Sequence, residues 1–188
     1  QKEFAEVWMA KKWGILNLCP RFGKIYTTIN ILEKFNPDIS ILIAYPDAKI
    51  KDSWEQDFET RRYKNPNITY TTHLSLHKHT IKRYDMLIVD EIHLLSDAQM
   101  DACMEVIDNA DSVLGLTGTL SSWTEADLHQ RLDLPVIAHY PIEQAIEEGV
   151  IVDYQITVLK VPLDNKVIMP IKGKERTEKK HFDATSWV

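Results

Sequence analysis

Short apolar runs alternate along this chain with longer segments whose apolar residues recur at helical spacing, and this alternation is the strongest constraint on the fold. Runs such as ISILIAY and MLIV show no polar alternation, which is typical of strands buried on both faces. Strands separated by helices pair in parallel through crossover connections. We therefore predict an α/β fold with a mostly parallel sheet, with strands at 14–19, 39–45, 68–72, 86–89 and 112–116 and helices at 25–35, 47–58 and 98–107.

Polar residues directly follow three of these predicted strands, at positions 20–24, 90–93 and 117–119. The carboxyl ends of parallel strands share one edge of a sheet, and ligands bind open α/β sheets at that edge. The sequence therefore places a candidate functional site there.

The composition is that of a globular domain, with 188 residues, of which 44% are hydrophobic and 27% charged. No apolar run approaches the roughly 18–20 residues of a membrane span, so we expect no membrane segment. Cys19 and Cys103 form neither a metal-ligand spacing nor a disulfide framework, which favours reduced thiols in a cytoplasmic protein. The first residue is not Met, and we expect the chain to be a fragment.

The net charge of −6 is unevenly distributed. Residues 49–83 carry eight Lys or Arg and four Asp or Glu, whereas residues 85–148 carry one and fourteen. A basic block inside an acidic chain indicates a local contact with a polyanion. Charge alone, however, favours an ordinary solvated surface at 49–83.

Gly23 and Lys24 stand between a predicted strand and a predicted helix, where backbone N–H groups and the helix dipole attract anions. Gly23 allows close approach of the backbone, and Lys24 can neutralise phosphate charge. The full phosphate-loop pattern also has a glycine five residues before Gly23 and a Ser or Thr after the lysine. Leu18 and Ile25 occupy those positions, so this segment alone is a weak match, and a lysine in a surface turn is the default interpretation.

Asp90 and Glu91 end an apolar strand, where two adjacent carboxylates are costly unless a cation is near. In phosphate-loop ATPases the first such carboxylate holds Mg²⁺ and the second orients and deprotonates the attacking water. An acidic start to a turn or helix is the alternative. Gly23-Lys24, on another strand of the same predicted sheet, favours the catalytic interpretation.

These segments resemble the motifs of superfamily 2 helicases and translocases. Asp90-Glu91-Ile92-His93 is similar to the DExH form of motif II, and LGLTGT at 114–119 is similar to motif III. PRFGK at 20–24 resembles a motif I variant of restriction-type and phage members. Residues 41–58 and 69–76 resemble motifs Ia and Ib loosely, and 141–154 resembles the exit from the first lobe in restriction-subunit and branch-migration relatives. The resemblance covers about residues 1–160.

The resemblance implies a RecA-like (P-loop NTPase) lobe that binds ATP and Mg²⁺ and contacts nucleic acid, with DNA favoured over RNA. It implies a nucleotide-binding segment made of Gln1, which would read adenine, together with Pro20, Arg21, Phe22, Gly23, Lys24 and Ile25. It implies catalytic roles for Lys24, for Asp90 as the Mg²⁺ ligand and for Glu91. It implies coupling of the nucleotide site to nucleic acid by His93, Thr117, Gly118 and Thr119. It implies nucleic-acid contacts at Pro46, Lys49, Thr71 and Thr72, the last three of which lie within the basic block.

Ile25 departs from the family pattern, because the residue after the loop lysine normally gives a hydroxyl to Mg²⁺. An isoleucine side chain has no donor or acceptor. Three explanations stay open: Thr27 or Thr28 substitutes through a water, the ion is held without this ligand, or the site binds and hydrolyses nucleotide poorly.

Three histidines, His73, His77 and His79, fall within seven residues. Such a cluster occasionally binds Zn²⁺, but no fourth ligand is nearby. A solvated basic loop is the favoured interpretation.

The leading hypothesis is the N-terminal ATP-binding lobe of a DNA helicase or translocase in a bacterial or phage-infected cytoplasm. We expect a lobe at 1–140, then an exit helix at 142–148, a strand at 154–161 and a basic linker towards a second RecA-like lobe that is missing here. The isolated chain should therefore be nearly inactive. The alternatives are a catalytically degenerate nucleic-acid or partner-binding module and the motor part of a restriction-type enzyme.

Overall fold

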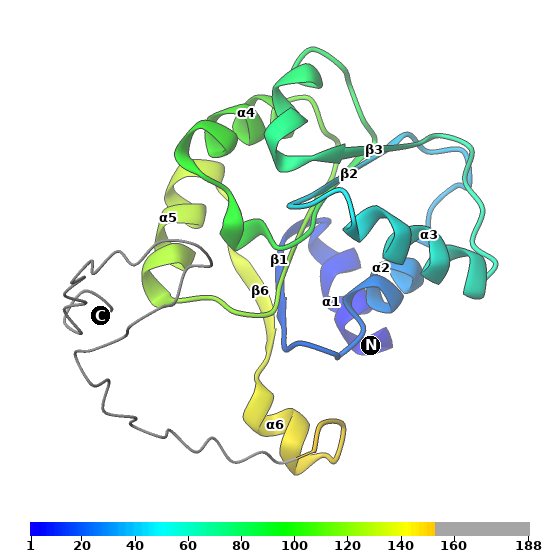
Figure 1. Cartoon of the computed structure of the whole chain (residues 1–188), viewed down its shortest axis with the longest axis vertical. Helices are drawn as coiled ribbons and strands as arrows, with labels where there is room; N and C mark the ends of the chain where they lie inside the picture. Colours follow the sequence, from blue (N-terminus) through cyan, green and yellow to red (C-terminus); the bar gives the residue numbers. More distant parts are fainter. Residues whose placement is uncertain (153–188) are drawn as a thin grey trace, which may run out of the picture. The chain divides into compact units, whose positions relative to one another are not determined.

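A computed structural model of the chain describes residues 1–152. Within them, six parallel strands form one sheet in the order β3-β2-β4-β5-β1-β6 (Figure 1). The strands are β1 (Trp13–Leu18), β2 (Ile41–Tyr45), β3 (Ile68–Thr72), β4 (Met86–Val89), β5 (Val113–Thr117) and β6 (Val136–Tyr140). The predicted α/β fold with a parallel sheet is confirmed.

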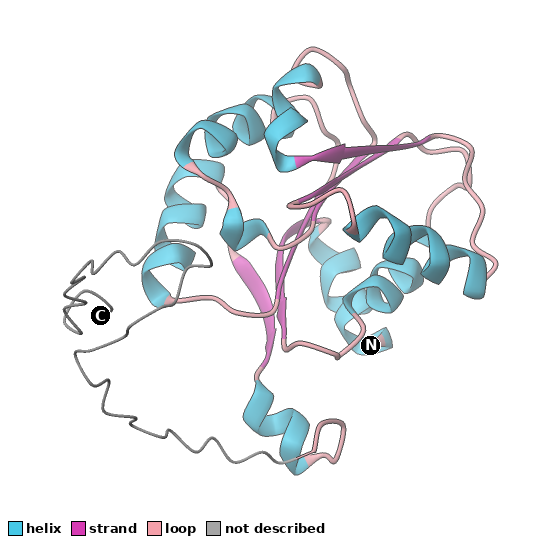
Figure 2. Ribbon diagram, viewed as in Figure 1, coloured by secondary structure: helices cyan, strands magenta, loops and turns pink. Residues whose placement is uncertain are grey.

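Helices cover both faces of this sheet (Figure 2). The α-helices are α1 (Lys2–Lys11), α2 (Lys24–Leu32), α3 (Ile50–Thr60), α4 (Asp97–Ile107), α5 (Ser122–Leu132) and α6 (Ile142–Glu147), and the short 3₁₀ helices are η1 (His73–Lys78) and η2 (Ile92–Leu94). Helices α1, α2 and α3 share a core with one face, and η1, η2, α4 and α5 share a core with the other. None of the helices in this described part is long and apolar enough to cross a membrane.

Alternate residues of each central strand enter opposite cores, as the two-fold periodicity of a strand requires. Leu16 of β1 joins the core with Trp8 and Trp54, whereas its neighbour Ile15 joins the core with Cys103. Both sides are therefore apolar, which explains why the sequence shows continuous apolar runs rather than alternation.

The observed boundaries of two predicted strands, 68–72 and 86–89, agree with the sequence prediction. The helix predicted at 47–58 begins later, at Ile50, because the Asp47 carboxylate accepts the Lys49 N–H at 2.8 Å and holds a turn there. The helix predicted at 25–35 ends at Leu32. Helix α5 and strand β6 are additional elements that the sequence pattern did not predict.

The exit helix predicted at 142–148 is present as α6, with a turn at Gly149 whose φ is 69°. The strand predicted at 154–161 and the basic linker predicted at 162–188 lie outside the described residues.

Candidate functional site

Three neighbouring strands bring the three polar segments together. The sheet order places β4, β5 and β1 side by side, and Asp90 follows β4, Thr117 ends β5 and the loop at 19–23 follows β1. All three lie at the carboxyl edge of the parallel sheet (Figure 1). Segments that are about 67 and 94 positions apart from Gly23 in sequence thus meet in one site, as the sequence analysis predicted.

The loop after β1 turns directly into α2. Gly23 is the residue before the helix, and its φ of 93° lies in the left-handed region that favours glycine. A β-carbon there would lie only 2.5 Å from Gln1 Nε2, which itself donates to the Phe22 carbonyl at 2.7 Å. No side chain caps the first turn of α2, so its N–H groups are available to an anion.

Lys24 is the first residue of α2, and its ammonium forms an ion pair with the Glu91 carboxylate. Both side chains are mostly buried, with exposed fractions of 16% and 27%. Glu91 has a φ of 47°, a left-handed conformation that is uncommon for a residue with a side chain and worth a functional explanation. The ion pair therefore joins the segment after β1 to the segment after β4.

Asp90 is 5% exposed, and its two carboxylate oxygens accept separate hydrogen bonds. Oδ1 accepts the Glu91 N–H at 3.0 Å, and Oδ2 accepts the Trp54 indole N–H at 3.1 Å. Burial raises the pKa of Asp90 above its ordinary value, although the Lys24 ammonium acts in the opposite direction. A cation bound beside Asp90 would favour its ionised form.

His93 lies between the Asp90-Glu91 segment and Thr117 at the end of β5. Its Nδ1 lies 2.8 Å from the Thr117 hydroxyl and 3.5 Å from Glu91 Oε2. Burial lowers the pKa of His93, which favours the neutral ring. The Thr117 hydroxyl also donates to the Thr119 carbonyl at 3.1 Å, and a β-carbon at Gly118 would lie 3.1 Å from the carbonyl at the end of β1. Of the four predicted coupling residues, His93 therefore lies beside Glu91 and Gly118 beside the loop after β1, while Thr117 contacts His93 and Thr119.

Ile25 is half-buried and packs against the apolar core beside α2. Thr27 and Thr28 are fully buried, and their hydroxyls donate to the carbonyls of Gly23 at 3.2 Å and Lys24 at 3.0 Å. Because both hydroxyls point back along their own helix, this arrangement does not support substitution by either threonine. The other two explanations for Ile25 stay open.

The residues at this edge fit a nucleotide phosphate with Mg²⁺. Gly23 leaves the helix terminus open, and Lys24 supplies a cation beside it. Within residues 1–152, no group of three His, Cys, Asp or Glu side chains could hold a metal. A single carboxylate, Asp90, suits Mg²⁺, which keeps several waters and takes its other ligands from phosphates.

A family model described as DEAD/DEAH box helicase matches residues 16–127, which is more than half of the chain. The chain belongs to the DEAD/DEAH box helicase family. The matched region includes the phosphate loop, Asp90-Glu91 and Thr117-Gly118-Thr119, so it covers every segment of the site described above except Gln1. A comparison with curated protein sequences gives no match.

Solved structures of two helicases and a large terminase share the fold of this member of the DEAD/DEAH box helicase family. The UvsW helicase of bacteriophage T4 has a TM-score of 0.60 at 18% identity, covering 74% of this chain and 58% of that chain. The Hef helicase domain of Pyrococcus furiosus has a TM-score of 0.58 at 16% identity, covering 73% of this chain and 37% of that chain. The large terminase of the thermophilic bacteriophage D6E has a TM-score of 0.52 at 11% identity, covering 77% of this chain and 46% of that chain. At these identities the likeness establishes the RecA-like fold, and the chain spans less than two thirds of each structure.

The four predicted nucleic-acid contacts of this helicase-family chain gather at the same carboxyl edge. Pro46 and Lys49 follow β2, and Thr71 and Thr72 end β3, its neighbour in the sheet. Lys49 is exposed and Thr71 is buried. Contact with nucleic acid itself stays a prediction.

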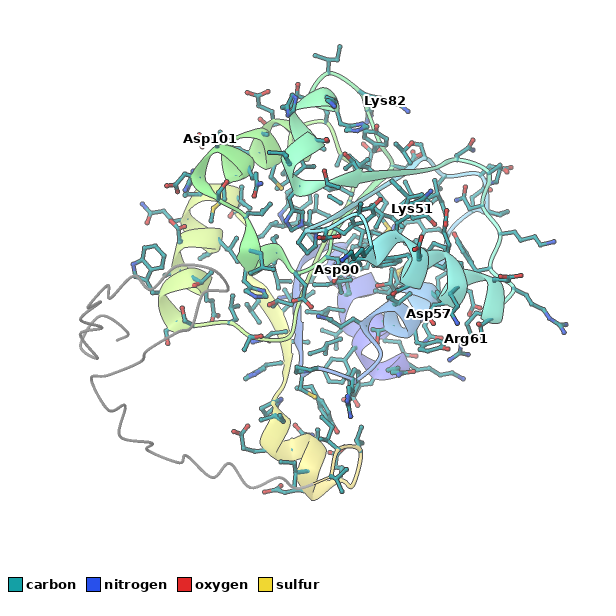
Figure 3. All side chains as sticks on the ribbon, viewed as in Figure 1. Lys51, Asp57, Arg61, Lys82, Asp90 and Asp101 are labelled. Carbon is teal, nitrogen blue, oxygen red and sulfur yellow. The ribbon has the colours of Figure 1, made fainter. Side chains whose placement is uncertain are left out.

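The cations of the basic block at 49–83 are not gathered at that edge alone. Helix α3 begins after β2, with Lys49 and Lys51 at the carboxyl edge, and the guanidinium of Arg61 at its other end lies 4.4 Å from the centroid of the Tyr26 ring, in the first turn of α2. Lys82 and the arginine after it directly precede β4. Figure 3 shows Lys82 well away from Asp90. The cations of the basic block therefore lie in separate places, and Lys82 lies apart from the site.

His73 is a site neighbour that the sequence analysis placed wrongly in a solvated loop. It is 3% exposed, and its Nε2 lies 2.9 Å from the Asp90 carbonyl oxygen. Burial lowers the pKa of His73 to about 4, so the ring is neutral at pH 7. Its position directly after β3, at the carboxyl edge of the sheet, is the sequence feature that could have identified His73 as a neighbour of the site. His77 and most of its basic neighbours are exposed.

A cavity of about 420 Å³ opens beside the phosphate loop. It is lined by Gln1 and Phe22 on one side and by Tyr140 and Glu148 on another. Phe22 and Tyr140 pack with ring centroids 4.5 Å apart, and the Tyr140 hydroxyl donates to Glu148 at 2.6 Å. Gln1 therefore borders a space next to Gly23, where the resemblance places the nucleotide base.

Proposed function

We propose that this chain is the ATP-binding lobe of a motor that hydrolyses ATP to move on or remodel nucleic acid. The observation that carries the proposal is the ion pair between Lys24 and Glu91, with Asp90 buried beside it, at an uncapped helix N-terminus. A lysine and two carboxylates with these neighbours are the groups that phosphoryl transfer to water requires.

Each of these side chains has a distinct task in the proposed reaction. Lys24 leaves Glu91 to bind the phosphates, which it reaches from the first turn of α2. Glu91 is then free to accept a proton from the attacking water. Asp90 holds Mg²⁺, which when bound neutralises charge on the phosphate oxygens. Gln1 and the neighbouring cavity receive the base.

Nucleic acid lies, in this proposal, along the edge formed by Lys49, Thr71 and Thr72. DNA is favoured over RNA because the motifs resemble those of restriction-subunit and phage relatives. Residues 1–140 form the lobe, and 141–188 lead to a second RecA-like lobe that supplies the remaining catalytic groups. A cytoplasmic protein of a bacterium or an infected cell fits these motifs.

Ile25 favours a second candidate function, in which the chain binds nucleic acid or a partner without turnover. The intact Lys24, Asp90 and Glu91 arrangement favours the motor. A motor for a restriction-type enzyme has the same site chemistry and differs only in its partner domains.

Calorimetric titration of the chain with ADP tests the proposal directly. We expect micromolar binding, and a loss of roughly tenfold or more in affinity in Lys24→Ala. Lys34→Ala is the matched control, because Lys34 lies just beyond the other end of α2 and is 41% exposed. Absence of ADP binding, or equal binding in Lys24→Ala and the parent, would contradict the proposal.

A further inference from the structure

Two buried side chains reach Asp90 from outside the phosphate-binding segments. Trp54, on α3, is fully buried and donates its indole N–H to Asp90 Oδ2 at 3.1 Å. His73, at the start of η1, is 3% exposed and contacts the Asp90 carbonyl at 2.9 Å. Because a carbonyl oxygen only accepts, Nε2 of His73 carries the proton and donates.

These two contacts fix the carboxylate and the backbone of Asp90 separately. With Oδ1 bound to the Glu91 N–H and Oδ2 bound to Trp54, the carboxylate plane cannot rotate without breaking a buried hydrogen bond. The backbone of Asp90 is held between its own N–H bond to the Ala44 carbonyl, at 2.8 Å, and the bond from His73. A buried hydrogen bond of this kind is costly to break, because the separated donor and acceptor have no water to bond instead.

Both side chains come from elements that begin at the predicted nucleic-acid edge. Trp54 lies five residues after Lys49, on the first turns of α3. His73 directly follows Thr72 at the end of β3. Helix α3 and η1 pack against opposite faces of the sheet, so Asp90 is held from both sides.

We propose that Trp54 and His73 are positioning residues that hold Asp90 in the orientation in which it binds the metal of a metal–nucleotide complex. The proposal rests on the proposed function, because it presumes that ADP and Mg²⁺ bind at Lys24 and Asp90. Neither side chain touches nucleotide, and each acts through Asp90 alone. Groups that orient a metal ligand are worth about 10–100-fold in metal affinity.

The test compares ADP affinity with Mg²⁺ and with EDTA. Trp54→Phe keeps an aromatic ring against Phe58 and removes the indole N–H together with the five-membered part of the ring. We expect it to lose roughly 10-fold or more of the Mg²⁺-dependent gain in affinity while keeping the affinity measured in EDTA. Trp8→Phe is the matched control, because Trp8 is equally buried and donates to a β5 carbonyl at 3.2 Å, remote from Asp90.

His73 is tested by a pair of variants that separate its hydrogen bond from its volume. His73→Leu removes the donor, and we expect it to lose the Mg²⁺-dependent gain. His73→Gln places an amide N–H near the original Nε2, and we expect it to restore most of the gain.

A readout without turnover follows the same contact. In an NMR spectrum the indole N–H resonance of Trp54 is identified by its absence from Trp54→Phe. Its chemical shift should change when Mg²⁺ and ADP are added together, whereas that of the Trp8 indole N–H should not. A parent chain that binds no ADP overturns the proposed function itself. A parent whose Mg²⁺-dependent gain survives in Trp54→Phe and His73→Leu, or that shows no such gain, overturns this inference and leaves the nucleotide site standing.

Discussion

Ile25 occupies the first turn of α2, next to the lysine that would bind phosphate, and presents only hydrocarbon there. Its side chain packs on the core rather than standing free. The neighbouring threonines use their hydroxyls within the helix, so the described site holds no close replacement. Any Mg²⁺ bound beside Asp90 therefore depends on the carboxylate, phosphates and waters.

Ile25→Thr should strengthen the Mg²⁺ dependence of ADP binding, because it restores the hydroxyl that the family pattern has at this position. We expect the Mg²⁺-dependent gain in affinity to rise about tenfold, at a cost of about 1 kcal/mol in the free energy of unfolding from lost apolar packing. Calorimetry with Mg²⁺ and with EDTA measures the first effect, and denaturant titration the second. Ile25→Val, which adds no hydroxyl, is the control, and equal Mg²⁺ dependence in all three proteins would refute the interpretation.

The residue roles that the sequence could predict are those carried by order along the chain. Lys24, Glu91 and Thr117 follow or end strands, so a parallel sheet brings them together once the strands are assigned. The partners of Asp90 could not be predicted in this way. The apolar spacing at 47–58 predicts a helix, but not which polar group the Trp54 indole contacts. The three histidines were expected in a solvated loop, and only the fold separates the buried His73 from the other two.

At the scale of elements, strands buried on both faces were the easiest to predict. Strand β6 lies at the sheet edge and is mostly half-buried, so its sequence VIAHY has a weaker apolar signal. Helix α5 buries only Leu128 and Leu132 on a largely polar surface. Its amino end is defined instead by Ser121, whose hydroxyl accepts the Thr124 N–H at 3.1 Å. An end cap of this kind is a local signal that apolar periodicity alone does not reveal.

Ser121→Ala should destabilise the chain by about 1 kcal/mol, because it leaves an N–H group of the first turn of α5 without its partner. Denaturant unfolding followed by circular dichroism measures the change. Ser122→Ala is the matched control: Ser122 is the next residue, is equally exposed and sits within the helix. Similar losses in both variants would show that the cap contributes nothing specific.

At the scale of the whole described domain, each face of the sheet buries one of the two cysteines of the chain. Cys103 is fully buried and Cys19 is 2% exposed. Burial raises the pKa of Cys103 to about 12 and also raises that of Cys19. At pH 8 the reactive thiolate of Cys103 is therefore rare, about one molecule in ten thousand.

Thiol labelling at pH 8 should therefore report opening of the fold. Cys19 stands at the start of the phosphate loop, so we expect it to react first, through local opening. Cys103, under α4, should react only on global unfolding, and a shift from pH 8 to pH 9 should leave most of the protection in place. Cys19→Ala isolates the signal of Cys103. Labelling of Cys103 within minutes in the folded chain would contradict the burial described here.

The position of β1 in the sheet has a consequence for how the chain is made. β1 leaves the ribosome before the other five described strands, yet its neighbours are β5 and β6, and its Trp13 pairs with Val113 and its Leu18 with Tyr140. About a hundred further residues must therefore be synthesised before the first partner strand of β1 is present. Such long-range pairing is slow and exposes apolar surface in the meantime. A nascent chain therefore carries β1 without a partner strand until β5 emerges.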